Sequence, residues 1–126
     1  MSMRIPLRAR RIMAGGLITS VCLAIAGNPI HSNADEAGAQ AKMELGRKIF
    51  TQIAVPQCGV CHTLADAGTT GEIGAKLEEL KPDAARVANA VRDGVGVMPS
   101  YAGKLTEEQI AAVAYYVSQA TAGANK

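Results

Sequence analysis

Two cysteines and the histidine that follows them carry the clearest chemistry in this chain: Cys58, Cys61 and His62. Cysteines three positions apart lie on the same side of a helical turn, so both thiols can reach one bound group. The pattern Cys-x-x-Cys-His is the attachment sequence of a c-type haem. Each thiol can form a thioether with a vinyl group of the porphyrin, and the imidazole can bind the iron. The motif therefore predicts one covalently attached haem c, with His62 as its first axial ligand.

Two other uses of paired cysteines fit the sequence less well. A thioredoxin-like redox pair needs a βαβ pattern around it, and none is visible. A zinc site needs a second pair of ligands further along the chain, but no Cys and no His follows His62. The haem interpretation is therefore favoured.

The second axial position of a haem iron needs a ligand, and the candidates are Met43 and Met98. Met43 lies on the packing face of a predicted helix. Met98 lies in residues 94–99, a loop whose glycines allow close approach to a ring face and which Pro99 stiffens. A lone Met usually fills the core, but a ligand role for Met98 explains this loop. We therefore predict that His62 and Met98 bind the metal.

The first 34 residues have the layout of a cleaved secretory signal. Four arginines precede an apolar stretch, residues 12–26, which is shorter than the ~20 residues that a membrane-spanning helix needs. Gly27 and Pro29 break this stretch, and we expect cleavage after Ala34. An uncleaved membrane anchor is the alternative. The sequence thus predicts a signal peptide over residues 1–34, export to the periplasm, and a single domain over residues 35–126.

Removal of the signal changes the charge of the chain. The full sequence carries 13 Lys and Arg against 11 Asp and Glu. The signal takes four basic and no acidic residues, so the remaining 92 residues carry 9 against 11, a net charge of −2. No nucleic-acid partner is indicated. With one Phe, three Tyr and no Trp, a single domain of this size buries little apolar area, which a porphyrin at the centre would supplement.

Apolar residues recur at helical spacing in three stretches, residues 41–53, 82–93 and 106–120. Residues 35–40 are expected to be frayed, residues 65–74 to form a loop, and residues 75–80 a short helical turn. No strand pattern is visible, so the expected fold class is all-α.

The ends of the two later helices carry capping signals. Pro82 suits a first helical position, and Gly94 suits a left-handed cap at the other end. Thr106 is expected to be the N-cap of the last helix, with Gln109 completing a capping box.

The order helix, Cys-Gly-Val-Cys-His, loop, helix, Gly-Val-Met-Pro, helix resembles that of class I cytochromes c across essentially all of residues 35–126. In that family a Gly of the first helix lets the last helix cross closely, with aromatic residues packed nearby. Gly46, Phe50 and Tyr116 match these positions. The resemblance implies a class I cytochrome c fold, three main helices wrapped around one covalently bound haem.

The family commonly has a Gly-Pro pair after the haem loop, whose Pro carbonyl accepts a hydrogen bond from the haem histidine. Here the pair is Gly74-Ala75, so the carbonyl is kept and the rigid ring is lost. Tyr101, Tyr115 and Arg86 could each reach a haem propionate, or have ordinary packing and surface roles.

Within that family, the stretches Pro-Gln-Cys-Gly-Val-Cys-His, Leu-Lys-Pro-Asp-Ala-Ala-Arg-Val and Gly-Val-Met-Pro resemble the small haem subunits of bacterial sulfite dehydrogenases. Iron bound by His62 and Met98 has no open site, so we expect single-electron transfer and not catalysis. The expected partners are a periplasmic dehydrogenase, in particular a molybdenum sulfite dehydrogenase, and a downstream cytochrome or oxidase. Three alternatives stay open: a general soluble carrier to a terminal oxidase, a five-coordinate haem sensor or enzyme if Met98 is not a ligand, and a purely structural role as a tightly held subunit.

Overall fold

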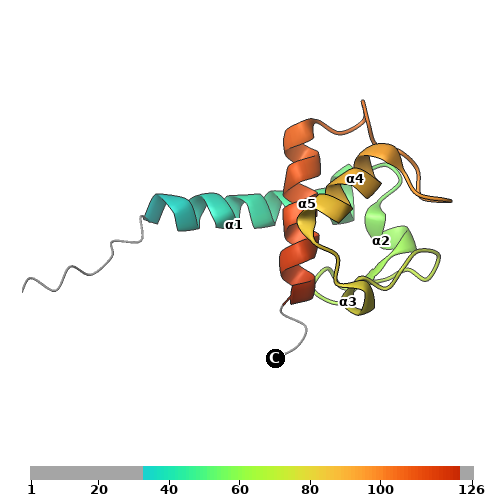
Figure 1. Ribbon diagram of the computed structural model, residues 1–126. Coiled ribbons are helices and arrows are strands. Elements are labelled where there is room, and N and C mark those ends of the chain that lie inside the picture. Colours follow the sequence, from blue (N-terminus) through green and yellow to red (C-terminus); the bar gives the residue numbers. More distant parts are fainter. Residues whose placement is uncertain (1–32, 123–126) are drawn as a thin grey trace, which may run out of the picture. The chain divides into compact units, whose positions relative to one another are not determined.

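The computed structural model describes residues 33–122 (Figure 1), all within the contact-defined unit His31–Lys126. In chain order the elements are α1 (Asn33–Lys48), the π-helix η1 (Ile49–Ile53), α2 (Cys58–Cys61), β1 (Thr63–Leu64), β2 (Thr69–Thr70), α3 (Leu77–Leu80), α4 (Ala84–Asp93) and α5 (Glu107–Ala122). The signal peptide predicted for residues 1–34 lies outside the described residues except for its last two positions, and it stays a prediction.

The first helix starts earlier than expected. α1 begins at Asn33, so the expectation that residues 35–40 are frayed is wrong. This segment is rich in alanine, the best helix former, and Asp35 and Glu36 complement the positive end of the helix. Cleavage after Ala34 would remove the first two residues of this helix.

The stretch expected as one regular helix, residues 41–53, widens at its end into η1. Ala54 closes the wide turn by donating its N–H to the Ile49 carbonyl at 3.1 Å. The Thr51 hydroxyl donates to the Arg47 carbonyl at 2.8 Å, an acceptor that a regular helix would give to the backbone N–H of Thr51. Competition for this carbonyl is a local reason for the departure from α-helical geometry.

α1 crosses α5 (Figure 1), and Gly46 lies where the two helices meet. A Cβ built on Gly46 would lie 2.3 Å from the Ala112 carbonyl oxygen and 2.4 Å from the Cβ of Tyr116, so only glycine allows this approach. Beside it, the rings of Phe50 and Tyr116 meet edge-on with centroids 6.1 Å apart. The expected contact between Gly46 and Tyr116 is confirmed.

The helix caps agree with the sequence in one case and differ in the other. Thr106 donates its N–H to the Gln109 side chain at 2.9 Å, and the Gln109 N–H donates to the Thr106 hydroxyl at 3.2 Å, so the capping box of α5 is confirmed. α4 begins later than expected. Asp83 is its N-cap and accepts from the Arg86 N–H at 2.8 Å, which leaves Pro82 outside the helix. A carboxylate is a strong N-cap acceptor, and this outweighs the preference of proline for the first turn.

The expectation of no strands is wrong. Thr63 pairs with Thr70, and Leu64 pairs with Thr69, in a small antiparallel hairpin directly after the haem motif. Strands of two residues are too short for an alternating pattern to show in the sequence. Apart from this hairpin, the regular elements of residues 33–122 are helical, so this part of the chain is mostly helical with a small sheet.

The predicted apolar face of the last helix is confirmed. Ile110, Val113, Tyr116 and Val117 are each no more than 2% exposed, and α5 packs on both α1 and α4.

Among residues 33–122, no helix is both long enough and apolar enough to cross a membrane.

Candidate haem site

A cavity of about 870 Å³ brings the predicted haem residues together. Its lining includes the two motif cysteines, His62 and Met98, with further residues from η1, α3, α4 and α5. Its volume falls within the ~300–1,000 Å³ range of typical ligand sites. Its lining is largely apolar, which suits a flat porphyrin. Val113 and Val117 of α5 form part of the wall.

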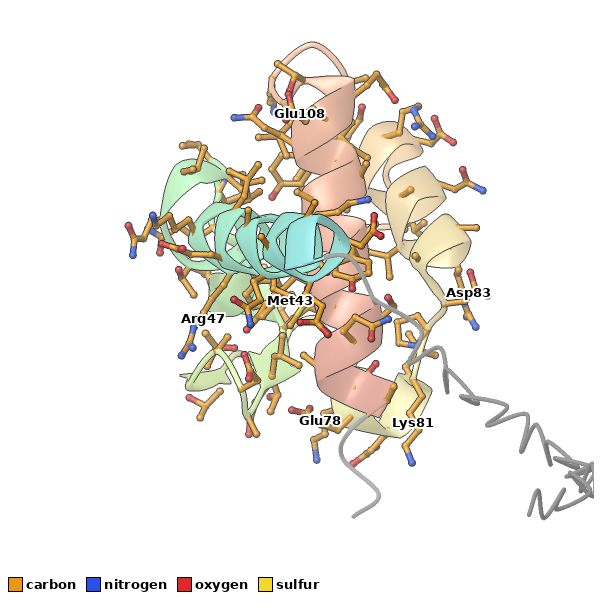
Figure 2. All side chains as sticks on the ribbon, turned by 90° about the vertical axis from the view of Figure 1, so that its left-hand side faces the viewer. Met43, Arg47, Glu78, Lys81, Asp83 and Glu108 are labelled. Atoms are coloured by element: carbon orange, nitrogen blue, oxygen red, sulfur yellow. The ribbon has the colours of Figure 1, made fainter. Side chains whose placement is uncertain are left out.

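The fold distinguishes the two methionines that are candidates for the second axial ligand. Met98 lines the cavity, on the same lining as His62. Met43 is not among the lining residues; it lies on α1 (Figure 2) and packs, partly buried, against the core. The geometry therefore favours Met98 over Met43 as the second axial ligand, and the assignment itself stays a prediction.

The imidazole of His62 is held in the orientation that a metal ligand needs. Its Nδ1 lies 2.8 Å from the carbonyl oxygen of Ala75. Because a carbonyl oxygen can only accept, Nδ1 carries the proton and the lone pair of Nε2 is free to bind iron. A Cβ on Gly74 would lie 2.4 Å from Cε1 of the ring. The Gly74-Ala75 pair thus keeps both the close approach and the acceptor without a proline.

The segment after the motif holds the motif in place. The Thr69 hydroxyl donates to the His62 carbonyl at 2.9 Å and accepts from the Leu64 N–H at 3.1 Å. The Gly74 N–H donates to the Cys61 carbonyl at 2.7 Å. The sequence interpretation did not single out Thr69. Its only signal is a Thr-Thr-Gly run soon after the motif, a composition shared by many loops.

α3 supports the same hairpin from outside. The Glu78 carboxylate, on α3 (Figure 2), accepts a hydrogen bond from the Ala65 N–H at the start of the hairpin turn. Gly68, in that turn, has a positive φ of 68° that favours glycine. The loop after the motif is therefore an ordered support for His62.

Burial makes one cysteine a poor nucleophile in the folded chain. Cys58 is 9% exposed. Burial raises the pKa of its thiol to about 11, and the neighbouring Cys61 thiol adds to the rise. Because the thiolate is the reactive form of a cysteine, the buried thiol is a poor nucleophile in this fold.

The Met98 loop depends on glycine. Val95 and Met98 exchange two backbone hydrogen bonds, 3.1 and 2.9 Å long, which close a tight turn. Gly94 has φ 76° and Gly96 has φ 59°. At Gly94 the φ is positive as expected, but ψ is 159°, outside the left-handed helical region that the sequence suggested. A Cβ there would also lie 2.8 Å from the Met98 carbonyl oxygen, which explains the glycine.

The three candidates for a propionate contact have different surroundings. Tyr101 is buried in the cavity wall, and its hydroxyl donates to the Pro56 carbonyl at 2.6 Å. Burial raises its pKa to about 12. Arg86 also lines the cavity. Tyr115 is not among the lining residues; its ring lies 5.2 Å from the Lys42 ammonium.

Comparison with known proteins shows the class to which this fold and site belong. Residues 41–117 match the family described as "Cytochrome C oxidase, cbb3-type, subunit III", which is more than half of the 126 residues. The chain therefore belongs to this family and is a c-type cytochrome of class I, a class that implies haem c. The oxidase in that description is not carried over to this chain.

Among solved structures, the chain is similar to the c-type cytochrome SorU from Sinorhizobium meliloti. The two share 54% sequence identity with a TM-score of 0.63, over 65% of this chain and 93% of SorU. No curated protein sequence matches. With the family assignment, this similarity identifies an electron-transfer protein that is not an enzyme in its own right.

Proposed function

We propose that this protein is a periplasmic cytochrome with one covalently attached haem that carries single electrons. The observation that supports this most strongly is the shared cavity of Cys58, Cys61, His62 and Met98, with Nδ1 of His62 already bonded to the Ala75 carbonyl. A haem bound there supplies one-electron chemistry between Fe(II) and Fe(III). Export rests on the signal-like layout of residues 1–34.

Each residue of the site has a distinct part in this proposal. Cys58 and Cys61 would hold the haem through two thioethers, each formed by adding an S–H across a vinyl double bond, so attachment would need no oxidant. His62 keeps its proton on Nδ1, which donates a hydrogen bond to the Ala75 carbonyl. Met98 would contribute a soft thioether, which favours the reduced metal. If His62 and Met98 both held the iron, a substrate would find no open coordination site.

Exposed apolar side chains around the cavity support docking of a redox partner. Ile73, Val95 and Val97 line the cavity and are 68%, 64% and 84% exposed, and Val60, between the two cysteines, is 57% exposed. Apolar side chains gathered beside a site mark protein-interaction surfaces. We therefore expect the electron donor to dock by apolar contact at the mouth of the cavity.

A molybdenum sulfite dehydrogenase is the donor that we propose, and a downstream cytochrome or oxidase is the acceptor. Sulfite oxidation releases two electrons, and a single-haem protein can take them one at a time. The choice of sulfite rests on the resemblance of the motif regions to the haem subunits of these enzymes. A general soluble carrier to a terminal oxidase is the second candidate.

The test starts from the full chain produced in bacteria that attach c-type haem, with export. We expect haem to stay attached after denaturation, and the ferric protein to be low-spin. Stopped-flow mixing with sulfite and the candidate dehydrogenase should reduce it. If it stays oxidised there but is reduced by an unrelated donor, the general carrier is supported and the sulfite proposal is wrong. A high-spin ferric protein that binds carbon monoxide when reduced would instead indicate a five-coordinate sensor or enzyme.

A further inference from the structure

The geometry points to Tyr101 as a positioning residue for Met98, acting through its hydrogen bond to the Pro56 carbonyl. The inference rests on the proposed ligand role of Met98. Tyr101 follows Met98 by three residues in the chain, and its side chain is 3% exposed. Its hydroxyl crosses to a segment 45 residues away and donates at 2.6 Å.

One end of this connection is fixed to α4. The Tyr101 N–H donates to the Val91 carbonyl at 2.9 Å, and the Ser100 hydroxyl donates to the Arg92 carbonyl at 2.6 Å. The Gly94 N–H donates to the Ala90 carbonyl at 2.9 Å. Both ends of the Met98 loop, residues 94–101, are thus hydrogen-bonded to the last turns of α4. We therefore expect the loop and α4 to move together.

The other end is fixed to the haem motif. Pro56 lies two residues before Cys58, which is buried in the cavity wall. The Tyr101 hydroxyl therefore joins the part of the cavity that holds Met98 to the part that holds the cysteines and His62. We infer that this hydrogen bond sets the distance between His62 and Met98, the two predicted axial ligands, although Tyr101 is not itself a ligand.

Loss of this bond should make the departure of Met98 easier. Local opening of a loop breaks the contacts that hold it to the rest of the fold, and the Tyr101–Pro56 bond is such a contact. An exogenous ligand that competes with Met98 then binds more tightly, because the open state is more populated. One hydrogen bond corresponds to a change of about two- to twelvefold in that population.

The experiment is an imidazole titration of the haem-loaded ferric protein. Tyr101→Phe keeps the ring and removes the hydroxyl, and should bind imidazole about two- to twelvefold more tightly than wild type. Tyr116→Phe is the matched control. It also removes a buried tyrosine hydroxyl, which donates to Asp66 at 2.5 Å, but Tyr116 does not line the cavity. It should lower the melting temperature and leave imidazole affinity at the wild-type value.

A double-mutant cycle separates failure of this inference from failure of the proposed function. In a Met98→Ala background nothing is left for Tyr101 to position, so adding Tyr101→Phe should not change imidazole affinity. If Met98→Ala itself leaves the affinity unchanged, Met98 is not a ligand and the proposed function is wrong. If Met98→Ala raises imidazole affinity but Tyr101→Phe does not, only the role of Tyr101 is wrong. The same holds if Tyr101→Phe raises imidazole affinity no more than Tyr116→Phe does.

A measurement on the wild-type protein applies even if Tyr101→Phe does not fold. The Tyr101 hydroxyl proton should exchange slowly with water in the ferric protein by NMR, and faster once imidazole has displaced Met98. Equal exchange in the two states would overturn the inference, because the bond would then be indifferent to Met98.

Discussion

Replacement of Gly46 by alanine tests the crossing of α1 and α5 on which the fold depends. The new Cβ would lie 2.3 Å from the Ala112 carbonyl oxygen and 2.4 Å from the Cβ of Tyr116. Both neighbours are buried residues of α5, so the helices must move apart. Overpacking of this kind costs ~1–3 kcal/mol, and a clash with backbone justifies the upper end. Alanine is favoured over glycine within a helix by ~1 kcal/mol, which leaves a net loss of ~2 kcal/mol.

A loss of this size is easily measured. For a domain of this length, 1 kcal/mol corresponds to ~4–8 °C in melting temperature, so Gly46→Ala should melt ~8–16 °C below wild type by far-UV circular dichroism. Gly38→Ala is the matched control, since Gly38 is in the same helix and its Cβ would meet nothing within 4 Å. That variant should be as stable as wild type or slightly more stable. The reasoning is refuted if Gly46→Ala melts at or above the wild-type temperature.

Two further predictions concern docking and pH. Val97→Asp adds a charge to the most exposed apolar residue of the cavity rim and should slow stopped-flow reduction by the donor. Gln119→Asp adds the same charge at an exposed position on α5 outside the cavity lining and should leave the rate unchanged. Equal rates for both variants would contradict apolar docking. The hydrogen bond and charge of Arg92 hold the pKa of the Glu107 carboxyl below its ordinary value of 4.5. The ion pair therefore stabilises the fold at pH values above 4.5, and this stabilisation is lost as the pH falls through the lowered pKa of Glu107. Wild type should therefore melt slightly higher than Glu107→Gln at neutral pH, with the difference vanishing in acid; a difference that does not depend on pH would exclude this linkage. The effect is small because both side chains are exposed.

The parts of the site that local sequence determines could be predicted. The spacing of Cys58, Cys61 and His62 is what covalent attachment of a c-type haem requires, and the Thr106 capping box needs no tertiary contact to form. The helix contact at Gly46 could also be predicted, because a glycine within a helix costs stability relative to alanine and a close contact explains its presence. For the motif and the capping box the physical cause lies within a few residues, whereas Gly46 signals by its residue type a contact that is itself tertiary.

Other parts, which individual side-chain hydrogen bonds to the backbone determine, whether distant or local in the chain, could not be predicted. The hydroxyl of Tyr101 bonds to a carbonyl 45 residues away, and no local pattern indicates that choice over a propionate. The hairpin at Thr63–Leu64 owes its register to Thr69, whose hydroxyl bonds to the backbone on the opposite strand. At Thr51 a side-chain hydrogen bond competes with the helix, which apolar periodicity does not detect.

The most direct test of the proposed site is the absorption spectrum of the ferric, haem-loaded protein. A methionine thioether on ferric haem iron produces a weak charge-transfer band at the red end of the visible range. We predict this band in wild type and in Met43→Ala, and its loss in Met98→Ala, which should become high-spin while the haem stays covalently attached. A Met98→Ala protein that keeps the band and an unchanged low-spin spectrum would contradict the ligand set of His62 and Met98.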